Sequence, residues 1–199
     1  MHMSIETDLM KDGIKVIEPL DHSSVISIAQ NVSKELFSAF PNYGFTYEDL
    51  FEKFSNVPMY VAEIPNGMAE ASYFYKNSSI YFRDGMGLNA LEKFSVHELI
   101  HHLQVQKDKN GNLYRLGLCE FNGSKISGMA LNEAAVQIIA SNTLNSTFEN
   151  VEYYGITFST ISPQVYPLIC NLVTQMAYVT GEDILFESTF KISDKFKNK

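Results

Sequence analysis

The sequence predicts an α+β protein in which helices precede and follow a small sheet. Apolar residues recur at helical spacing from Ser23 to Phe40. Aromatic and β-branched residues then dominate between Met59 and Phe82, a composition typical of strands. Helical spacing returns at Asn89 and continues to about Gln106. Helices and strands therefore fall in separate runs along the chain, which favours the α+β class.

The N-terminal half is predicted to contain two helices, a small mixed sheet and a longer helix packed on that sheet. Pro41 ends the first helix, and a second, short helix follows Thr46. Asn77 and Ser78 supply turn residues between the last two strands and favour a hairpin. The strands are expected at residues 59–62, 72–75 and 80–82.

Asn89, with Glu92 three residues later, resembles a capping box at the start of the longer helix, the last element of the N-terminal half. The C-terminal half, which follows that helix, is expected to be mostly helical. Ser162 and Pro163 open a strongly apolar helix, which Gly181 closes. Between these helices we expect a strand or extended loop at 114–121, a helix at 127–141 and an extended stretch at 151–160.

Length and composition favour a single domain. The chain has 199 residues, of which 45% are hydrophobic, enough for one sizeable core and few for two. No internal repeat and no Pro/Ser/Gly-rich linker divides it. We therefore expect one domain over residues 1–199, with an N-terminal lobe to about 106, a helical lobe at about 107–190 and a flexible tail at 191–199.

Charge and patterning exclude several classes of protein. A formal net charge of -8 disfavours binding of nucleic acid through its phosphates, and no apolar run is long enough for a membrane span. The N-terminus lacks the basic-then-apolar order of a signal peptide, so we expect a cytoplasmic protein unless a leader has been removed. Cys119 and Cys170 are expected to be reduced, buried thiols.

A possible metal site lies in the longer helix, where His97-Glu98-Leu99-Ile100-His101 forms an H-E-x-x-H sequence. At about 100° per residue, His97 and His101 lie about 40° apart and one turn above each other, so both imidazoles can reach one ion. His102 points elsewhere and is not expected to be a ligand. The apolar residues of this helix occupy the opposite face, as expected of a helix that lines a cleft.

A third ligand has to come from another part of the chain, because catalytic zinc sites have three protein ligands and one water. No histidine follows His102, which excludes the three-histidine arrangement of metzincins. Glu133, in the predicted helix at 127–141, lies on the side opposite the apolar residues Leu131, Ala135 and Ile138. It is therefore the candidate third ligand.

The H-E-x-x-H sequence and the later Asn132-Glu133 together resemble the gluzincin clan of zinc metallopeptidases, and the chain is closest in size to the single-domain minigluzincins. The resemblance covers His97 to about Gln137. It implies one catalytic Zn²⁺ held by His97, His101 and Glu133, with Glu98 as general base. It also implies a zincin-like fold, in which a small sheet precedes the first zinc helix and its edge strand binds an extended substrate.

The sequence departs from that pattern at Gln137, where many gluzincins have an aspartate that accepts a hydrogen bond from a zinc histidine. An amide oxygen also accepts a hydrogen bond, but it carries no charge. A tetrahedral oxyanion needs a second donor besides the metal, and the resemblance to gluzincins implies that it comes from a segment after the third ligand. Tyr154 is the first candidate, Tyr153 and Tyr166 are alternatives, and Arg115 is a further one.

These residues predict a zinc-dependent metallopeptidase that acts on a peptide or protein substrate. The metal acidifies its bound water, and Glu98 removes the proton so that hydroxide attacks the peptide carbonyl. Two alternatives stay open. One is a dedicated regulatory protease with a single cellular substrate, and the other is a non-catalytic, zinc-containing module that binds another protein.

Overall fold

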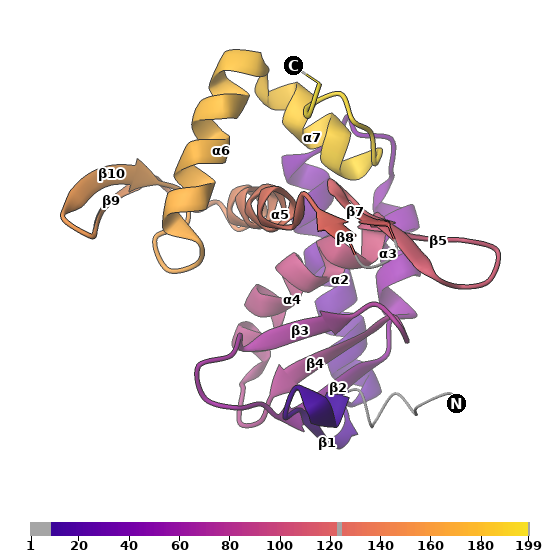
Figure 1. Cartoon of the computed structure of the whole chain (residues 1–199). Coiled ribbons are helices and arrows are strands. Elements are labelled where there is room, and N and C mark those ends of the chain that lie inside the picture. The colour runs from indigo at the N-terminus through magenta and orange to yellow at the C-terminus, as the bar shows by residue number, and fades with distance from the viewer. Residues whose placement is uncertain (1–8, 123–124, 199) are drawn as a thin grey trace. The chain divides into compact units, whose positions relative to one another are not determined.

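The computed structural model describes residues 9–122 and 125–198 (Figure 1). These residues form two compact units, the first comprising 9–41 and 45–102 and the second comprising 42–44, 103–122 and 125–198. The boundary falls inside a continuous helix, α4 (Leu88–Gln104), whose last two residues belong to the second unit. Helices and strands occur in both units, which confirms the α+β class.

Among its described residues, the first unit contains a mixed sheet of four strands, where the sequence predicted a small mixed sheet of three. Its order is β1-β2-β4-β3, with β2 and β4 parallel and the other two pairs antiparallel. The predicted hairpin is confirmed between β3 and β4, while the fully exposed β1 was not predicted. The strands are β1 (Lys15–Pro19), β2 (Met59–Glu63), β3 (Ala71–Phe74) and β4 (Ser79–Arg83).

The helices of the first unit are α2 (His22–Ala39), α3 (Tyr47–Ser55) and most of α4, and they confirm the predicted helices. The side chain of Asp21 caps α2, and a capping box between Thr46 and Asp49 starts α3. The largest fully buried side chains of this unit come from these helices and from β4: Ile28, Leu36, Leu50, Phe54, Ile80, Phe82, Leu99 and Ile100.

The predicted capping box at the start of α4 is wrong. Helix α4 begins at Leu88, so Asn89 lies inside it and is not the N-cap residue. The carbonyl of Gly87 accepts hydrogen bonds from the N–H groups of Ala90 and Leu91, the third and fourth residues of the helix. The Glu92 carboxylate accepts hydrogen bonds from Ser27 and Asn31 of α2 instead, at 3.1 and 2.6 Å. The Glu92 carboxylate, which the sequence spacing assigned to the N-terminal cap of α4, therefore joins α4 to α2 instead.

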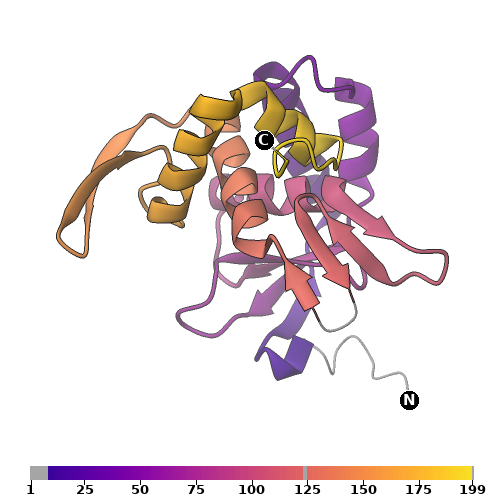
Figure 2. The same ribbon diagram turned by 45° about the horizontal axis from the view of Figure 1, so that its top comes forward.

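In the part of the second unit that the structure describes, there are a four-stranded antiparallel sheet, a two-stranded hairpin and three helices. Figure 2 shows these elements from another side. The sheet has the order β5-β6-β7-β8, so its strands follow one another as a meander. Its first strand occupies residues 105–107, where the sequence predicted the end of α4. The elements are β5 (Val105–Lys107), β6 (Leu113–Leu116), β7 (Cys119–Asn122), β8 (Lys125–Ser127), α5 (Met129–Thr143), β9 (Glu149–Tyr153), β10 (Ile156–Thr160), α6 (Pro167–Thr180) and α7 (Glu182–Phe190).

The apolar helix α6 begins at Pro167, not at Ser162 and Pro163 as the sequence predicted. The Ser162 hydroxyl donates to the carbonyl of Val165 at 2.6 Å and closes a turn before the helix. Tyr166 then adopts a left-handed conformation, with φ of 50°, as the N-cap residue. Pro167 follows Tyr166 directly, and it is the proline that lies in the first turn of α6.

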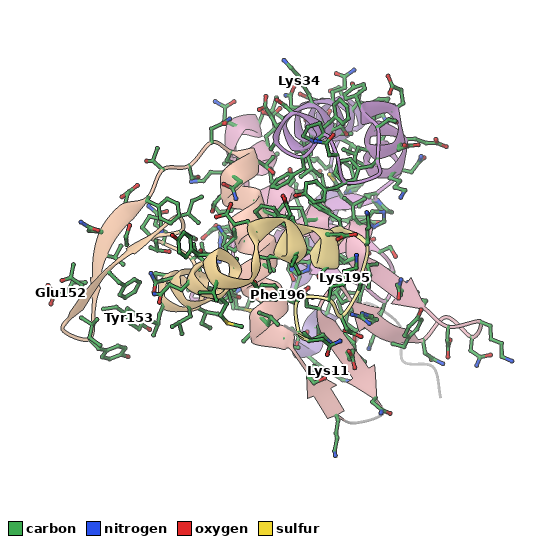
Figure 3. The ribbon with its side chains drawn as sticks, turned by 90° about the horizontal axis from the view of Figure 1, so that it is seen from above. Lys11, Lys34, Glu152, Tyr153, Lys195 and Phe196 are labelled. Carbon is green, nitrogen blue, oxygen red and sulfur yellow. The ribbon has the colours of Figure 1, made fainter. Side chains whose placement is uncertain are left out.

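An apolar core joins α5, α6, α7 and the segment after α7 in the second unit. Phe196 is buried in this core, and its N–H donates to the Ser188 hydroxyl at 3.0 Å, although residues 191–199 were expected to form a flexible tail. Figure 3 shows Lys195 and Phe196 on this segment after α7.

Cys119 and Cys170 are buried free thiols, and burial raises the pKa of Cys170 to about 12. Among the described residues, no helix is both long and apolar enough to cross a membrane.

Candidate metal centre

The two histidines of the H-E-x-x-H sequence lie side by side on α4. Their Nε2 atoms are 3.0 Å apart, and their ring centroids are separated by 4.7 Å. Val96, Leu99 and Ile100 are buried on the apolar face of the same helix, as its pattern predicted. Burial of that face fixes the rotation of α4, and helical spacing then brings the two imidazoles together.

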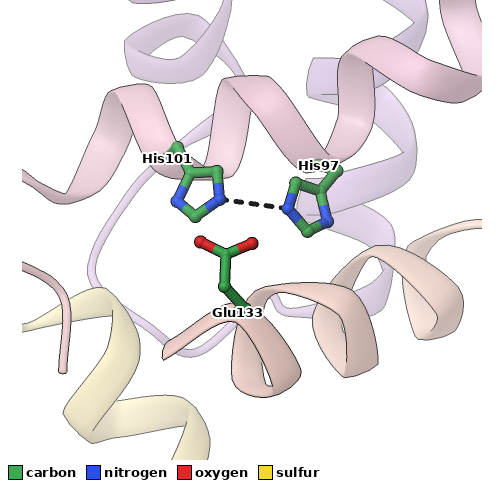
Figure 4. Close-up of side chains that lie close together, drawn as sticks. All are labelled: His97, His101 and Glu133. Atoms are coloured by element: carbon green, nitrogen blue, oxygen red, sulfur yellow. Dashed lines mark hydrogen bonds between the residues drawn. The ribbon is translucent and has the colours of Figure 1, made fainter. Parts of the chain in front are cut away.

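Glu133 of α5 completes a group of three metal-ligating side chains (Figure 4). One ligand atom from each of His97, His101 and Glu133 can be chosen so that all three lie within 4.8 Å of one another. Two nitrogens bound to zinc at about 2.0–2.1 Å in tetrahedral geometry are about 3.3 Å apart, close to the separation of the two Nε2 atoms. The three side chains could therefore hold one small divalent ion.

A buried amide network fixes α5 in the second unit at the residue before Glu133. The Asn132 side chain is only 1% exposed; its amide donates to Gln104 at 3.2 Å, and its oxygen accepts from the Leu118 N–H at 2.9 Å. Gln104 lies three residues after His101, in the last turn of α4. Gly117 completes the packing, because a Cβ atom at this position would lie 2.3 Å from the Asn132 side-chain oxygen.

We predict that Asn132→Ala lowers the free energy of unfolding by about 3 kcal/mol, because it leaves the Leu118 N–H and the Gln104 side-chain oxygen buried without this partner. Urea denaturation monitored by circular dichroism measures the change. Asn150→Ala, at an exposed position of β9, is the matched control and should stay within about 0.5 kcal/mol of the unaltered chain. Equal stability of the two variants would contradict this role of Asn132.

Glu98 contacts the first unit's sheet through its carboxylate. The backbone N–H of Tyr73 in β3 donates to Oε2 of Glu98 at 2.6 Å, and Glu98 is 9% exposed. The Tyr73 hydroxyl lies 3.1 Å from Nδ1 of His102, the histidine that the sequence excluded as a ligand. Burial raises the pKa of Tyr73, so its hydroxyl stays protonated at neutral pH. Sequence reasoning missed Tyr73, because periodicity carries no information on a contact between residues 25 apart.

The structure places the remaining predicted site residues in the second unit. Tyr154 occupies the turn between β9 and β10 and is 90% exposed. Tyr153, labelled in Figure 3, packs edge-on against Tyr154 with ring centroids 4.6 Å apart. Tyr166 precedes α6 and is half-exposed. The Arg115 guanidinium donates to Asp194 at 2.7 Å and holds the pKa of that carboxyl at about 2. An oxyanion-binding role for any of these residues stays a prediction.

Gln137 lies one turn after Glu133 on α5. Its side-chain amide donates to the Ser141 hydroxyl at 3.4 Å, one further turn along the helix. This bond uses the side-chain nitrogen of Gln137 as its donor. Acceptance of a hydrogen bond from a zinc histidine by the amide oxygen stays a prediction.

Comparisons with models of protein families, with curated proteins and with solved structures found no match. The chemistry of the centre therefore follows from its own side chains. Two imidazoles and one carboxylate are a donor set that could hold an ion such as zinc, and three protein ligands would leave a fourth position for water or substrate. Glu98 lies between two of these ligands in sequence and is a carboxylate of the kind that moves protons in such sites.

Proposed function

We propose that the chain is a zinc metallopeptidase of the gluzincin type, with a zincin-like arrangement of sheet and H-E-x-x-H helix. The observation that carries the proposal is the group of His97, His101 and Glu133, whose ligand atoms lie within 4.8 Å of one another. Three protein ligands are the number that a catalytic zinc site uses, whereas a structural site uses four. This ligand count favours catalysis over a purely structural role for the metal.

The residues of this centre have separate roles in the proposed reaction. His97, His101 and Glu133 would hold the zinc, which when bound would supply an acidified water and a polarised substrate carbonyl. Glu98 would accept a proton as general base and pass it to the leaving amine. The low exposure of Glu98 keeps bulk water away from this carboxylate and favours direct proton transfer.

The sheet of the first unit offers a place for an extended peptide. β3 is an edge strand, and it lies next to Glu98 through the hydrogen bond from Tyr73. A peptide that pairs with an edge strand gains main-chain hydrogen bonds that depend little on its sequence. We therefore propose a peptide or protein as the substrate.

Metal content and hydrolysis of a diverse peptide library, measured on the same preparation, test this function. We expect one zinc per chain, and we expect chelation to lower hydrolysis at least a hundredfold and one equivalent of zinc to restore it. Zinc without hydrolysis of any library peptide would favour a dedicated protease or a binding module. Absence of zinc binding, after incubation with excess zinc and removal of unbound metal, would contradict the proposal.

A further inference from the structure

The backbone N–H of Tyr73 faces the outer edge of the first unit's sheet. The Arg83 N–H donates to the Glu70 carbonyl at 2.9 Å, which identifies these two residues as a hydrogen-bonded pair of the antiparallel β3 and β4. Such pairs alternate along a strand, so Tyr73, three residues later, directs its N–H away from β4. β3 ends the strand order, and no other described strand pairs with this edge.

The Glu98 carboxylate accepts a hydrogen bond from the Tyr73 N–H, the group that the edge of β3 would otherwise offer to another strand. The bond from the Tyr73 N–H to Oε2 of Glu98 is 2.6 Å long, and bonds to an ionised carboxylate are stronger than those to a neutral carbonyl. An extended peptide that adds to β3 needs the same N–H for its own carbonyl. One N–H cannot serve both acceptors at full strength, so the two interactions oppose each other.

A second contact joins β3 to α4 without using Glu98. The Tyr73 hydroxyl lies 3.1 Å from Nδ1 of His102, and the two rings meet edge to face with centroids 5.7 Å apart. Because this contact does not involve the Glu98 carboxylate, a change in the side-chain conformation of Glu98 would not break it.

We propose that Glu98 and an extended peptide compete for the backbone N–H of Tyr73, so that binding of the peptide along β3 releases the Glu98 carboxylate. The inference rests on the proposed function, in which the peptide is the substrate and Glu98 the general base. Under this proposal, the Glu98 carboxylate is free to act as the base only when a substrate is aligned along β3. Peptides that cannot pair with β3 would leave Glu98 bound to Tyr73.

Amide hydrogen exchange of the full, chelator-treated chain tests the bond between Glu98 and Tyr73. We expect the Tyr73 amide to exchange at least tenfold faster in Glu98→Ala than in the unaltered chain. Glu98→Gln is the matched control, because its side-chain oxygen still accepts a hydrogen bond, and its exchange should stay close to that of the unaltered chain. Equal exchange in all three chains would overturn the inference.

Peptide binding to the same three chains tests the competition. The probe is a hexapeptide of alternating threonine and valine, blocked at both ends, titrated while the Tyr73 amide resonance is followed by NMR. We expect the resonance to shift and the Kd to be roughly three- to tenfold lower for Glu98→Ala than for the unaltered chain. Equal Kd values, an unmoved resonance or no binding would overturn the inference. Neither measurement uses zinc or hydrolysis, so a failure of the metallopeptidase proposal is detected separately.

Discussion

Glu98→Gln is expected to lower kcat/KM for peptide hydrolysis about a thousandfold, while the chain still binds one zinc. The substitution keeps the shape of the side chain and the acceptor for the Tyr73 N–H, but it removes the carboxylate that accepts a proton. General bases contribute about 10²- to 10⁴-fold to the reactions they assist. Zinc stoichiometry and steady-state kinetics on one preparation measure the two effects.

The control for this variant is Glu52→Gln, at an exposed position of α3 in the same unit. It makes the same chemical change on the surface and should leave kcat/KM within about a factor of two. Hydrolysis by Glu98→Gln at the rate of the unaltered chain would show that another group removes the proton. Loss of zinc together with activity would instead assign Glu98 to metal binding and contradict its role as the base.

Local spacing accounts for the features of the centre that the sequence predicted. His97 and His101 lie together because residues four apart share a helix face, whatever the surrounding fold. Glu133 was inferred from the need for a third ligand and from the side of its helix, and the structure brings its carboxylate close to both histidines. The hairpin of β3 and β4 followed from turn residues, which act over a few positions.

Contacts between distant segments account for what the sequence did not predict. The Glu92 carboxylate has the right spacing for a cap, but it bonds to Ser27 and Asn31, more than sixty residues earlier. The strand β1 is exposed along its length and shows no alternation that could reveal it. The bond from Tyr73 to Glu98 needs the edge position of β3, which depends on the order of all four strands.

The start of α6 shows a limit of local rules. Both Pro163 and Pro167 satisfy the preference for proline in the first turn of a helix. The structure uses the second, because the Ser162 hydroxyl bonds the Val165 carbonyl and Tyr166 turns the chain in a left-handed conformation. A tyrosine with positive φ is uncommon, so no sequence rule would have placed the helix start there.

Removal of the third ligand should separate metal binding from folding. We expect Glu133→Ala to weaken zinc binding more than a hundredfold, since even changes to groups that only support a ligand cost about 10- to 100-fold. The stability of the metal-free chain should change by less than about 1 kcal/mol, because Glu133 is only half-buried and alanine favours the helix. Competition with a chromophoric zinc chelator measures affinity, and urea denaturation measures stability.

The matched control is Glu149→Ala, which removes an exposed carboxylate at the start of β9 in the same unit and should leave zinc affinity unchanged. Asn132→Ala gives the opposite pattern to Glu133→Ala, with a large loss of stability in the metal-free chain, because its amide joins α5 to α4 and to the Leu118 backbone. Zinc affinity in Glu133→Ala equal to that of Glu149→Ala would contradict the ligand role. A fall in affinity with preserved metal-free stability would assign the Glu133 carboxylate to the metal, because a merely structural residue could not produce that combination.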